Sequence, residues 1–194
     1  MNQRSLIYLL AFIVTIGSVA TNIYIPALPV VREYFDATVA QAQATFSIAL
    51  LTFAVGMLFW GPFADRYGRR LAILAGVGLM AAGSVVCLFA SSLAWLIAGR
   101  GVLAFGTATG IAVSRTIVSD LYPDSMARML AQLAIFAVVS SASAPVIGGF
   151  LTSWFGWRSV FAAQVVMAAA VAWLTWKHLP ETRPATKQPP DVRE

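Results

Sequence analysis

The sequence predicts an all-α integral membrane protein with six transmembrane helices. Of its 194 residues, 59% are hydrophobic and 11% are charged, whereas a soluble domain carries about 45–50% apolar and about 25% charged residues. The apolar residues form six continuous runs, each about long enough to cross roughly 30 Å of hydrocarbon as a helix. The positive charges between these runs favour one side of the membrane, as in multi-pass proteins.

The six expected spans belong to a bundle that we assign to residues 1–179. They cover residues 6–26, 44–63, 71–90, 93–114, 129–152 and 160–176. The first run is longer than the roughly 7–15 apolar residues of a cleavable signal peptide, and five further runs follow it. The runs do not alternate apolar with polar residues, which argues against membrane strands. Residues 180–194 are polar and contain several prolines, so a cytoplasmic tail or linker is expected there.

The basic residues predict the orientation of the bundle. Ten of the thirteen Lys and Arg residues fall on the side of both termini, two fall on the other side, and Arg100 lies within a span. This bias predicts cytoplasmic termini in the cell (inner) membrane. It also explains the net charge of +5 by topology, so the lipid bilayer is an expected partner and nucleic acid is not.

The sequence offers no basis for an enzyme or a metal site. It contains one cysteine, Cys87, and one histidine, His178, which excludes a metal cluster built on Cys or on a His pair. No activated nucleophile or acid pair is evident. We therefore expect neither catalysis nor a cofactor.

The turn between the second and third spans has the pattern of a conformational latch. Residues 61–70 read GPFADRYGRR, in which Gly68 suits a tight reversal. Asp65 can pair with Arg66 or Arg69 in a partly desolvated place. An ordinary charged turn is the alternative. The residues assigned to the latch are Gly61, Asp65, Arg66, Gly68, Arg69 and Arg70, together with Arg115 and Asp120 near the inner end of the fourth span.

The fifth span carries small residues around a proline. They are Ser140, Ala144, Pro145, Gly148 and Gly149. The proline removes a backbone hydrogen bond, and the small side chains allow a neighbouring helix to approach closely. We interpret this segment as a hinge, with ordinary helix packing as the alternative.

Arg100 is the one charged residue expected deep in the membrane. It lies about seven residues, or about 10 Å, from the outer end of its helix. It should face a wet cavity or a polar partner, because a buried guanidinium cannot lose its proton. Snorkelling to the outer surface is the alternative.

Further polar residues are candidates for a substrate or coupling path. They are Thr15, Ser18, Asn22 and Tyr24 in the first span and Thr107 in the fourth, in addition to Arg100. Tyr24 would suit a lipophilic ligand through apolar contacts and a cationic one through cation–π contacts. Alternatively, the hydroxyl groups serve only in helix packing.

These segments resemble motifs of the major facilitator superfamily of transporters. The turn at 61–70 is similar to its loop motif GxxxDRxGRR. The fifth span is similar to its antiporter motif GxxxGPxxGG, with Ser140 and Ala144 replacing two glycines. Arg100 is similar to the arginine of the fourth-span pattern RxxQGxG, although Leu103 and Ala104 replace the glutamine and the first glycine.

The first span narrows the resemblance to Bcr/CflA-type, bicyclomycin-resistance-like multidrug/proton antiporters. Residues 21–29 read TNIYIPALP, similar to TDxYLPALP in that group, and residues 179–182 read LPET. The resemblance covers nearly the whole chain and implies the N-terminal six-helix half of a twelve-span transporter.

Asn22 stands where the resemblance implies a proton-carrying aspartate. An amide has no titration near pH 7, and all eight acidic residues fall in loops, span ends or the tail. We therefore expect that this half does not carry the proton through that site.

Two functions follow as hypotheses. The first is efflux of drugs or other small lipophilic molecules by alternating access, which requires a second six-helix bundle in the same orientation, either a homodimer partner or a separate second half. The second is a truncated half-transporter that does not transport, or a membrane interaction module.

Overall fold

The computed structural model describes residues 3–179, which form six long and three short helices. The long helices are α1 (Gln3–Asn22), α3 (Val39–Tyr67), α4 (Arg69–Leu88), α5 (Leu93–Leu121), α6 (Met126–Phe155) and α7 (Arg158–His178). The short ones are η1 (Ile25–Ala27), α2 (Leu28–Tyr34) and η2 (Pro123–Ser125). No strand occurs among the described residues. The predicted all-α fold with six membrane-spanning helices is confirmed, and six helical segments are long and apolar enough to cross a membrane. The expected tail at 180–194 lies outside the described residues.

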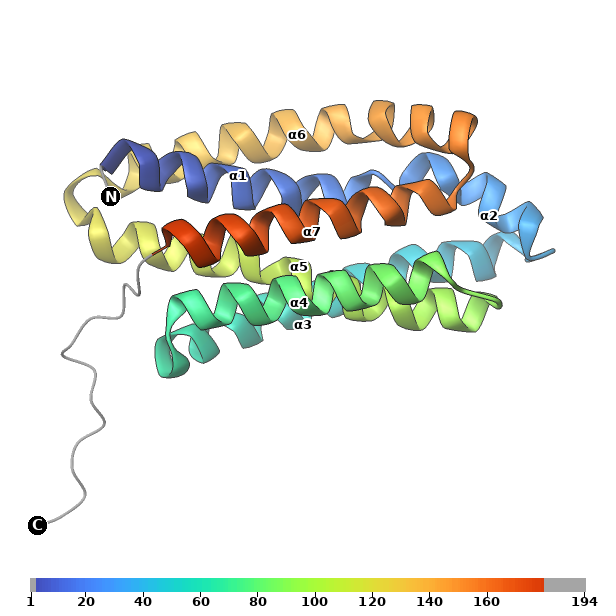
Figure 1. Ribbon diagram of the computed structural model, residues 1–194, viewed down its shortest axis with the longest axis horizontal. Helices are drawn as coiled ribbons and strands as arrows, with labels where there is room; N and C mark the ends of the chain where they lie inside the picture. The colour runs from blue at the N-terminus through green and yellow to red at the C-terminus, as the bar shows by residue number, and fades with distance from the viewer. Residues whose placement is uncertain (1–2, 180–194) are drawn as a thin grey trace, which may run out of the picture.

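The long helices lie side by side along one axis, so that the two ends of the bundle are well separated (Figure 1). The start of α1 and the end of α7 lie at the same end, which we call the proximal end. The turn between α3 and α4 and the C-terminus of α5 are also there. The other end, which carries α2 and the start of α7, is the distal end. The predicted topology would put the proximal end in the cytoplasm.

Helix α5 lies at the centre of the bundle and contacts α1, α3, α4 and α6. Its contact with α4 is made through glycines. A Cβ atom on Gly106 of α5 would overlap the backbone of Gly76 in α4, and one on Gly83 of α4 would overlap the backbone of Leu103. Only glycine allows this approach. In lipid, where no hydrophobic effect drives helices together, such close packing holds them in contact.

Helices α1 and α6 also pack through small residues. Ser140, Ala144 and Gly148 follow one another at intervals of four residues, and all three are buried. They lie on one face of α6 because residues four apart share a helix face. At Gly148 the backbone of α6 reaches the end of α1, where a Cβ atom would overlap the carbonyl oxygen of Ile23.

Arg158 ties the helices together at the distal end. Its Nε atom donates a 3.1 Å hydrogen bond to the carbonyl oxygen of Leu88, and Nη2 donates to that of Ala90, also at 3.1 Å. These carbonyls at the end of α4 have no partner within their own helix. The guanidinium also lies over the rings of Trp157 and Tyr34, at 4.3 and 4.8 Å. The N-terminus of α7 is thereby joined to α4 and α2.

The connection between α1 and α3 is helical, although no span is expected there. Pro26 lies in η1 and Pro29 at the start of α2, positions where the missing N–H would have no helical partner. Helix α3 then begins with a capping box, in which the Thr38 side chain accepts from the backbone N–H of Gln41 and the Gln41 side chain accepts from that of Thr38. The two prolines and the capping box thus account for where η1, α2 and α3 begin, although the short helices η1 and α2 were not predicted from the sequence.

The contact at Gly148 yields a prediction with a matched control. Gly148→Ala should destabilise the protein by about 1–3 kcal/mol, because its Cβ would force α6 away from α1. Gly149→Ala adds the same atom one residue later, where the nearest atom is the Pro26 Cβ at 3.9 Å. Both variants gain the same helix propensity. Thermal unfolding in detergent should show a lower midpoint for Gly148→Ala only, and equal midpoints would contradict the contact.

Candidate functional site

Arg100 occupies the centre of the first candidate site. Two turns into α5, its side chain is almost fully buried, with 1% exposed. The Nε atom donates a 3.3 Å hydrogen bond to the carbonyl oxygen of Thr45 in α3. The guanidinium carbon lies 3.9 Å from the centroid of the Tyr24 ring, which follows α1. Arg100 thus joins three helical segments and does not snorkel to the surface.

A chain of hydrogen bonds fixes Tyr24 in this position. The Thr45 hydroxyl donates to the carbonyl oxygen of Ala42 at 2.6 Å. The Tyr24 hydroxyl, 3.0 Å from the Thr45 oxygen, must therefore donate to it. The phenol ring is held next to the guanidinium, and this cation–π pairing is strongest where water is absent.

The expected use of Tyr24 changes as a result. The ring face that could attract a cationic ligand is already covered by Arg100. No hydrogen bond reaches Arg100 Nη1 from the described part of the chain, and no Asp or Glu forms an ion pair with the guanidinium there. The site therefore concentrates a permanent positive charge that cannot exchange protons.

The other path candidates do not gather around Arg100. Thr107 is buried and donates to the carbonyl oxygen of Leu103 in its own helix, at 2.7 Å. Its surroundings include Gly17 of α1, where a Cβ would lie 3.5 Å from the Thr107 carbonyl oxygen. Ser18 is also buried, and Thr15 is half-buried. These positions fit the packing alternative that the sequence left open.

Asn22 links α1 to α6. Its Nδ2 atom donates to the carbonyl oxygen of Ser18 at 2.9 Å and to the Ser141 hydroxyl at 3.4 Å. An ionised aspartate could accept from the Ser141 hydroxyl but could not bond to the Ser18 carbonyl, because it carries no donor. The amide therefore has a structural role at this position.

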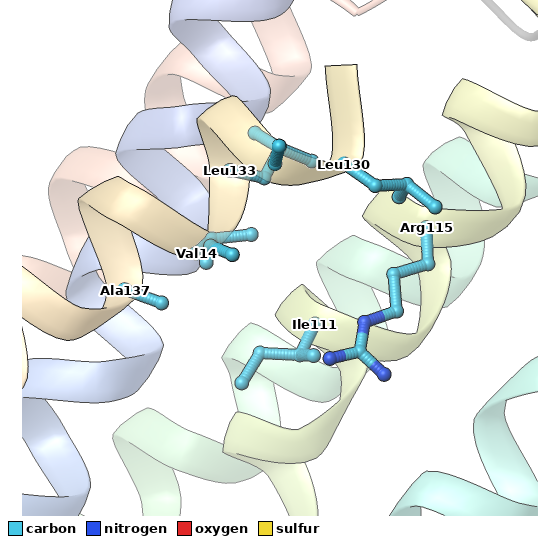
Figure 2. A pocket seen from close by; sticks show the side chains of 8 residues that line it. Val14, Ile111, Arg115, Leu130, Leu133 and Ala137 are labelled. Carbon is cyan, nitrogen blue, oxygen red and sulfur yellow. The ribbon is translucent and has the colours of Figure 1, made fainter. Parts of the chain in front are cut away.

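A second candidate site is a cavity of about 370 Å³ between α1, α5 and α6. We call it the Arg115 pocket. Its lining consists of Val14, Ile111, Arg115, Leu130, Ala131, Leu133, Ala134 and Ala137. Figure 2 shows the guanidinium of Arg115 extending from α5 past Ile111, across from Val14 and the apolar side chains of α6. The cavity is thus apolar apart from one cation.

The third site is the latch at the proximal end. Gly68 has a φ of 101°, which explains the need for glycine between α3 and α4. Arg69, the next residue, is buried and pairs with Asp120 of α5 through Nη2. The same nitrogen lies 3.7 Å from Asp65 of α3. One arginine thus joins three helices.

The remaining latch candidates have other partners. Arg66 stacks on Tyr67, with the guanidinium carbon 5.4 Å from the ring centroid. Arg70 donates a 2.6 Å hydrogen bond to the carbonyl oxygen of Trp176 in α7. At Gly61 a Cβ would meet nothing within 4 Å, so the structure shows no close approach that requires glycine.

The structure separates Arg115 from the predicted latch. It precedes Asp120 by five residues in α5, which corresponds to about 140° of rotation around the helix at 100° per residue. Asp120 faces α4, whereas Arg115 lines the cavity beside α1 and α6. Arg115 was assigned to the latch because it lies near the inner end of the span, but that position does not determine which face of α5 the side chain is on.

The fifth-span segment lies in α6 as a continuous helix. Pro145 is inside this helix, and the neighbouring Ala144 and Gly148 are buried against α1. The Ser140 hydroxyl donates to the carbonyl oxygen of Phe136 at 2.6 Å. Close packing is evident at this segment, and its use as a hinge stays a prediction.

Three polar side chains make contacts between segments that the sequence did not indicate. Thr45 connects Tyr24 with Arg100, Ser141 accepts from Asn22, and Gln164 of α7 donates to the carbonyl oxygen of Ala20 at 2.8 Å. Gln164 is a lone polar residue in an apolar run, whereas Ser141 and Thr45 lie among other polar residues and did not stand out. Their partners are far away in sequence and could not be read from it.

Comparisons with known proteins agree with this architecture. The family model of the Major Facilitator Superfamily matches residues 10–194. Multidrug resistance protein D of Escherichia coli is 34% identical over 181 residues, covering 93% of this chain and 46% of that protein. The Bicyclomycin resistance protein homolog of Haemophilus influenzae is 28% identical over 189 residues, covering 94% and 47%.

Two solved structures share the fold. The proton:xylose symporter XylE, bound to 6-bromo-6-deoxy-D-glucose, matches with a TM-score of 0.76 and 16% identity over 93% of this chain and 46% of that chain. A bacterial homolog of the human lysosomal transporter Spinster matches with a TM-score of 0.74 and 22% identity over 99% and 47%. The chain spans about half the length of the relatives it matches. With its six apolar helices it is an integral multi-pass membrane protein, and it belongs to the major facilitator superfamily of transporters.

Proposed function

We propose that this chain forms one half of an exporter for small lipophilic molecules that works by alternating access. The observation that carries the proposal is the match of all six helices to less than half of two solved transporters. The names of the relatives, which include multidrug and bicyclomycin resistance proteins, support export of drug-like molecules. A transport path in such a protein lies between two bundles.

The second bundle would face this one in the same orientation. It is either a second copy of the chain or a separate second half. Both ends of the described bundle lie at the proximal end, so two copies could be joined in tandem without an additional span. In the proposed orientation, the protein lies in the inner membrane with its proximal end facing the cytoplasm.

The latch would control the passage between the two open states. Arg69 is buried, so losing its carboxylate partner would leave a charge in a place with little water. Its pairing with Asp120 holds the proximal end of α5 against the turn between α3 and α4. We propose that this contact is made in one state of the cycle and released in the other.

Dye export tests the proposed function. Cells that lack their main drug exporters would express residues 1–194 alone, as a tandem of two copies, or with the second half of the Escherichia coli relative. Export of several lipophilic dyes should rise above that of empty cells when a second bundle is available. The measurement is dye retention over time at matched membrane expression.

The same assay separates the two hypotheses. If the chain is folded in the membrane but no combination exports any dye, the non-transporting half is favoured and the exporter is rejected. That alternative has support in the absence of any carboxylate from the interior of the six apolar runs.

The latch makes a prediction about turnover. Asp120→Asn should slow export several-fold at unchanged expression, because an amide replaces the charged partner of a buried arginine, a bond worth roughly 1.5–3 kcal/mol. Asp65→Asn should have a smaller effect, since Asp65 lies 3.7 Å from Arg69 and its side chain is 40% exposed. Asp124→Asn, at an exposed position in η2, is the control. Equal export by all three variants would refute the latch.

Asn22 makes a prediction about coupling. Asn22→Asp introduces a group that can retain the bond to the Ser18 carbonyl only when it is protonated. Export by the tandem protein should then respond to a pH gradient imposed across vesicles, whereas the unchanged tandem should respond less. The comparison uses initial rates with and without the gradient. A variant as insensitive as its parent would contradict a proton path at this site.

A further inference from the structure

The guanidinium of Arg115 lines the Arg115 pocket and has no part in the latch or in the Arg100 site. Among the described residues, no side-chain hydrogen bond or ion pair involves Arg115, and the nearby Asp120 pairs instead with Arg69. It lies six residues before the end of α5, so about 9 Å from that end along the helix. A guanidinium at this depth is costly unless it meets water or an anion.

The lining of the pocket determines which ligand would suit it. Seven of its eight residues are apolar, and the eighth is Arg115. No Asp or Glu lines it. The volume of about 370 Å³ falls at the lower end of the range for small-molecule sites. Such a cavity favours one apolar body with one negative group beside the guanidinium.

A cationic ligand would find no comparable attraction in the Arg115 pocket. It would be repelled by Arg115, and the Tyr24 ring that could bind it is already paired with Arg100. The buried Arg100 and Arg115, which is exposed on this bundle at the wall of the pocket, therefore favour the same sign of ligand charge.

We propose that the Arg115 pocket binds small amphipathic anions, with a carboxylate, sulfonate or phosphate at Arg115 and an apolar body against α1 and α6. This inference rests on the proposed function and names its substrate class. Arg115 is then a specificity-determining residue, because its fork of N–H donors matches the oxygens of such groups.

A binding assay with the full chain in a neutral detergent tests the proposal. The probe is dansylamino-undecanoic acid, and the reference is its primary amide, which has the same apolar body and no charge. The acid should bind about tenfold more tightly than the amide, as expected for one charge-assisted contact. Fluorescence titration measures both affinities.

Three variants assign the preference to its residue. Arg115→Gln should reduce the ratio of the two affinities to about one, and Arg115→Lys should retain part of it because the charge remains. Arg128→Gln removes the same charge from an exposed position outside the pocket and should retain the full ratio. Because all proteins are compared in the same micelles, partition of the probe into detergent cancels. A ratio near one in the unchanged protein, or a full ratio in Arg115→Gln, would overturn the proposal.

A competition experiment with lipids distinguishes a soluble amphipathic anion from an anionic lipid headgroup as the ligand. Phosphatidylglycerol or phosphatidylcholine is added to the micelles at equal amounts. Equal, weak displacement of the acid by both lipids supports a site for soluble anions. Selective displacement by phosphatidylglycerol would assign the pocket to a lipid headgroup and overturn the proposed substrate class. Binding is measured without transport, so loss of the anion preference with intact dye export rejects this inference alone.

Discussion

Close approach of helix backbones is the constraint on which this structure depends. Lipid tails are as apolar as leucine side chains, so burial of apolar surface gives little reason for one helix to choose another. Here the choice is made by steric fit at glycines such as Gly106 in α5 and Gly148 in α6, where a Cβ would overlap a facing backbone. The hydrogen bonds of Gln164 and Asn22 to other helices act in the same way. The precise positions of the functional side chains follow from these contacts.

Charge is placed in this protein according to depth. The ion pairs of Arg69 lie at the proximal end of the bundle and the cation–π contacts of Arg158 at the distal end, and each arginine joins several helices. Arg100 is stabilised in the interior by an aromatic ring and a carbonyl oxygen, without a carboxylate among the described residues. Since neither a tyrosine ring nor a carbonyl neutralises the charge, the interior of this half keeps a positive potential.

The fold was predictable from the sequence because long apolar runs have few alternatives in a membrane. Only helices satisfy their own backbone there, so length and hydropathy suffice for the six spans. The turn at Gly68 was predictable for a similar reason, since few residues adopt its φ of 101°. The partners of Arg100 were not, because Thr45 and Tyr24 are distant in sequence and meet only through helix packing. The assignment of Arg115 to the latch was wrong because it did not consider the helix face. Its spacing of five residues from Asp120 already places the two side chains on different faces of α5.

The composition of this half bears on the nature of the second bundle. Helices α1 and α5 are the most enclosed, and large apolar side chains such as Leu58 of α3 and Val138 of α6 are exposed. A second bundle packed beside the Arg115 pocket would complete a cavity whose wall from this chain is apolar apart from Arg115. A second copy would contribute the same wall, and its spans would again contain no carboxylate in their interior. Export driven by protons would therefore need a titratable group that only a separate second half could contribute, whereas a homodimer would have to use another driving force.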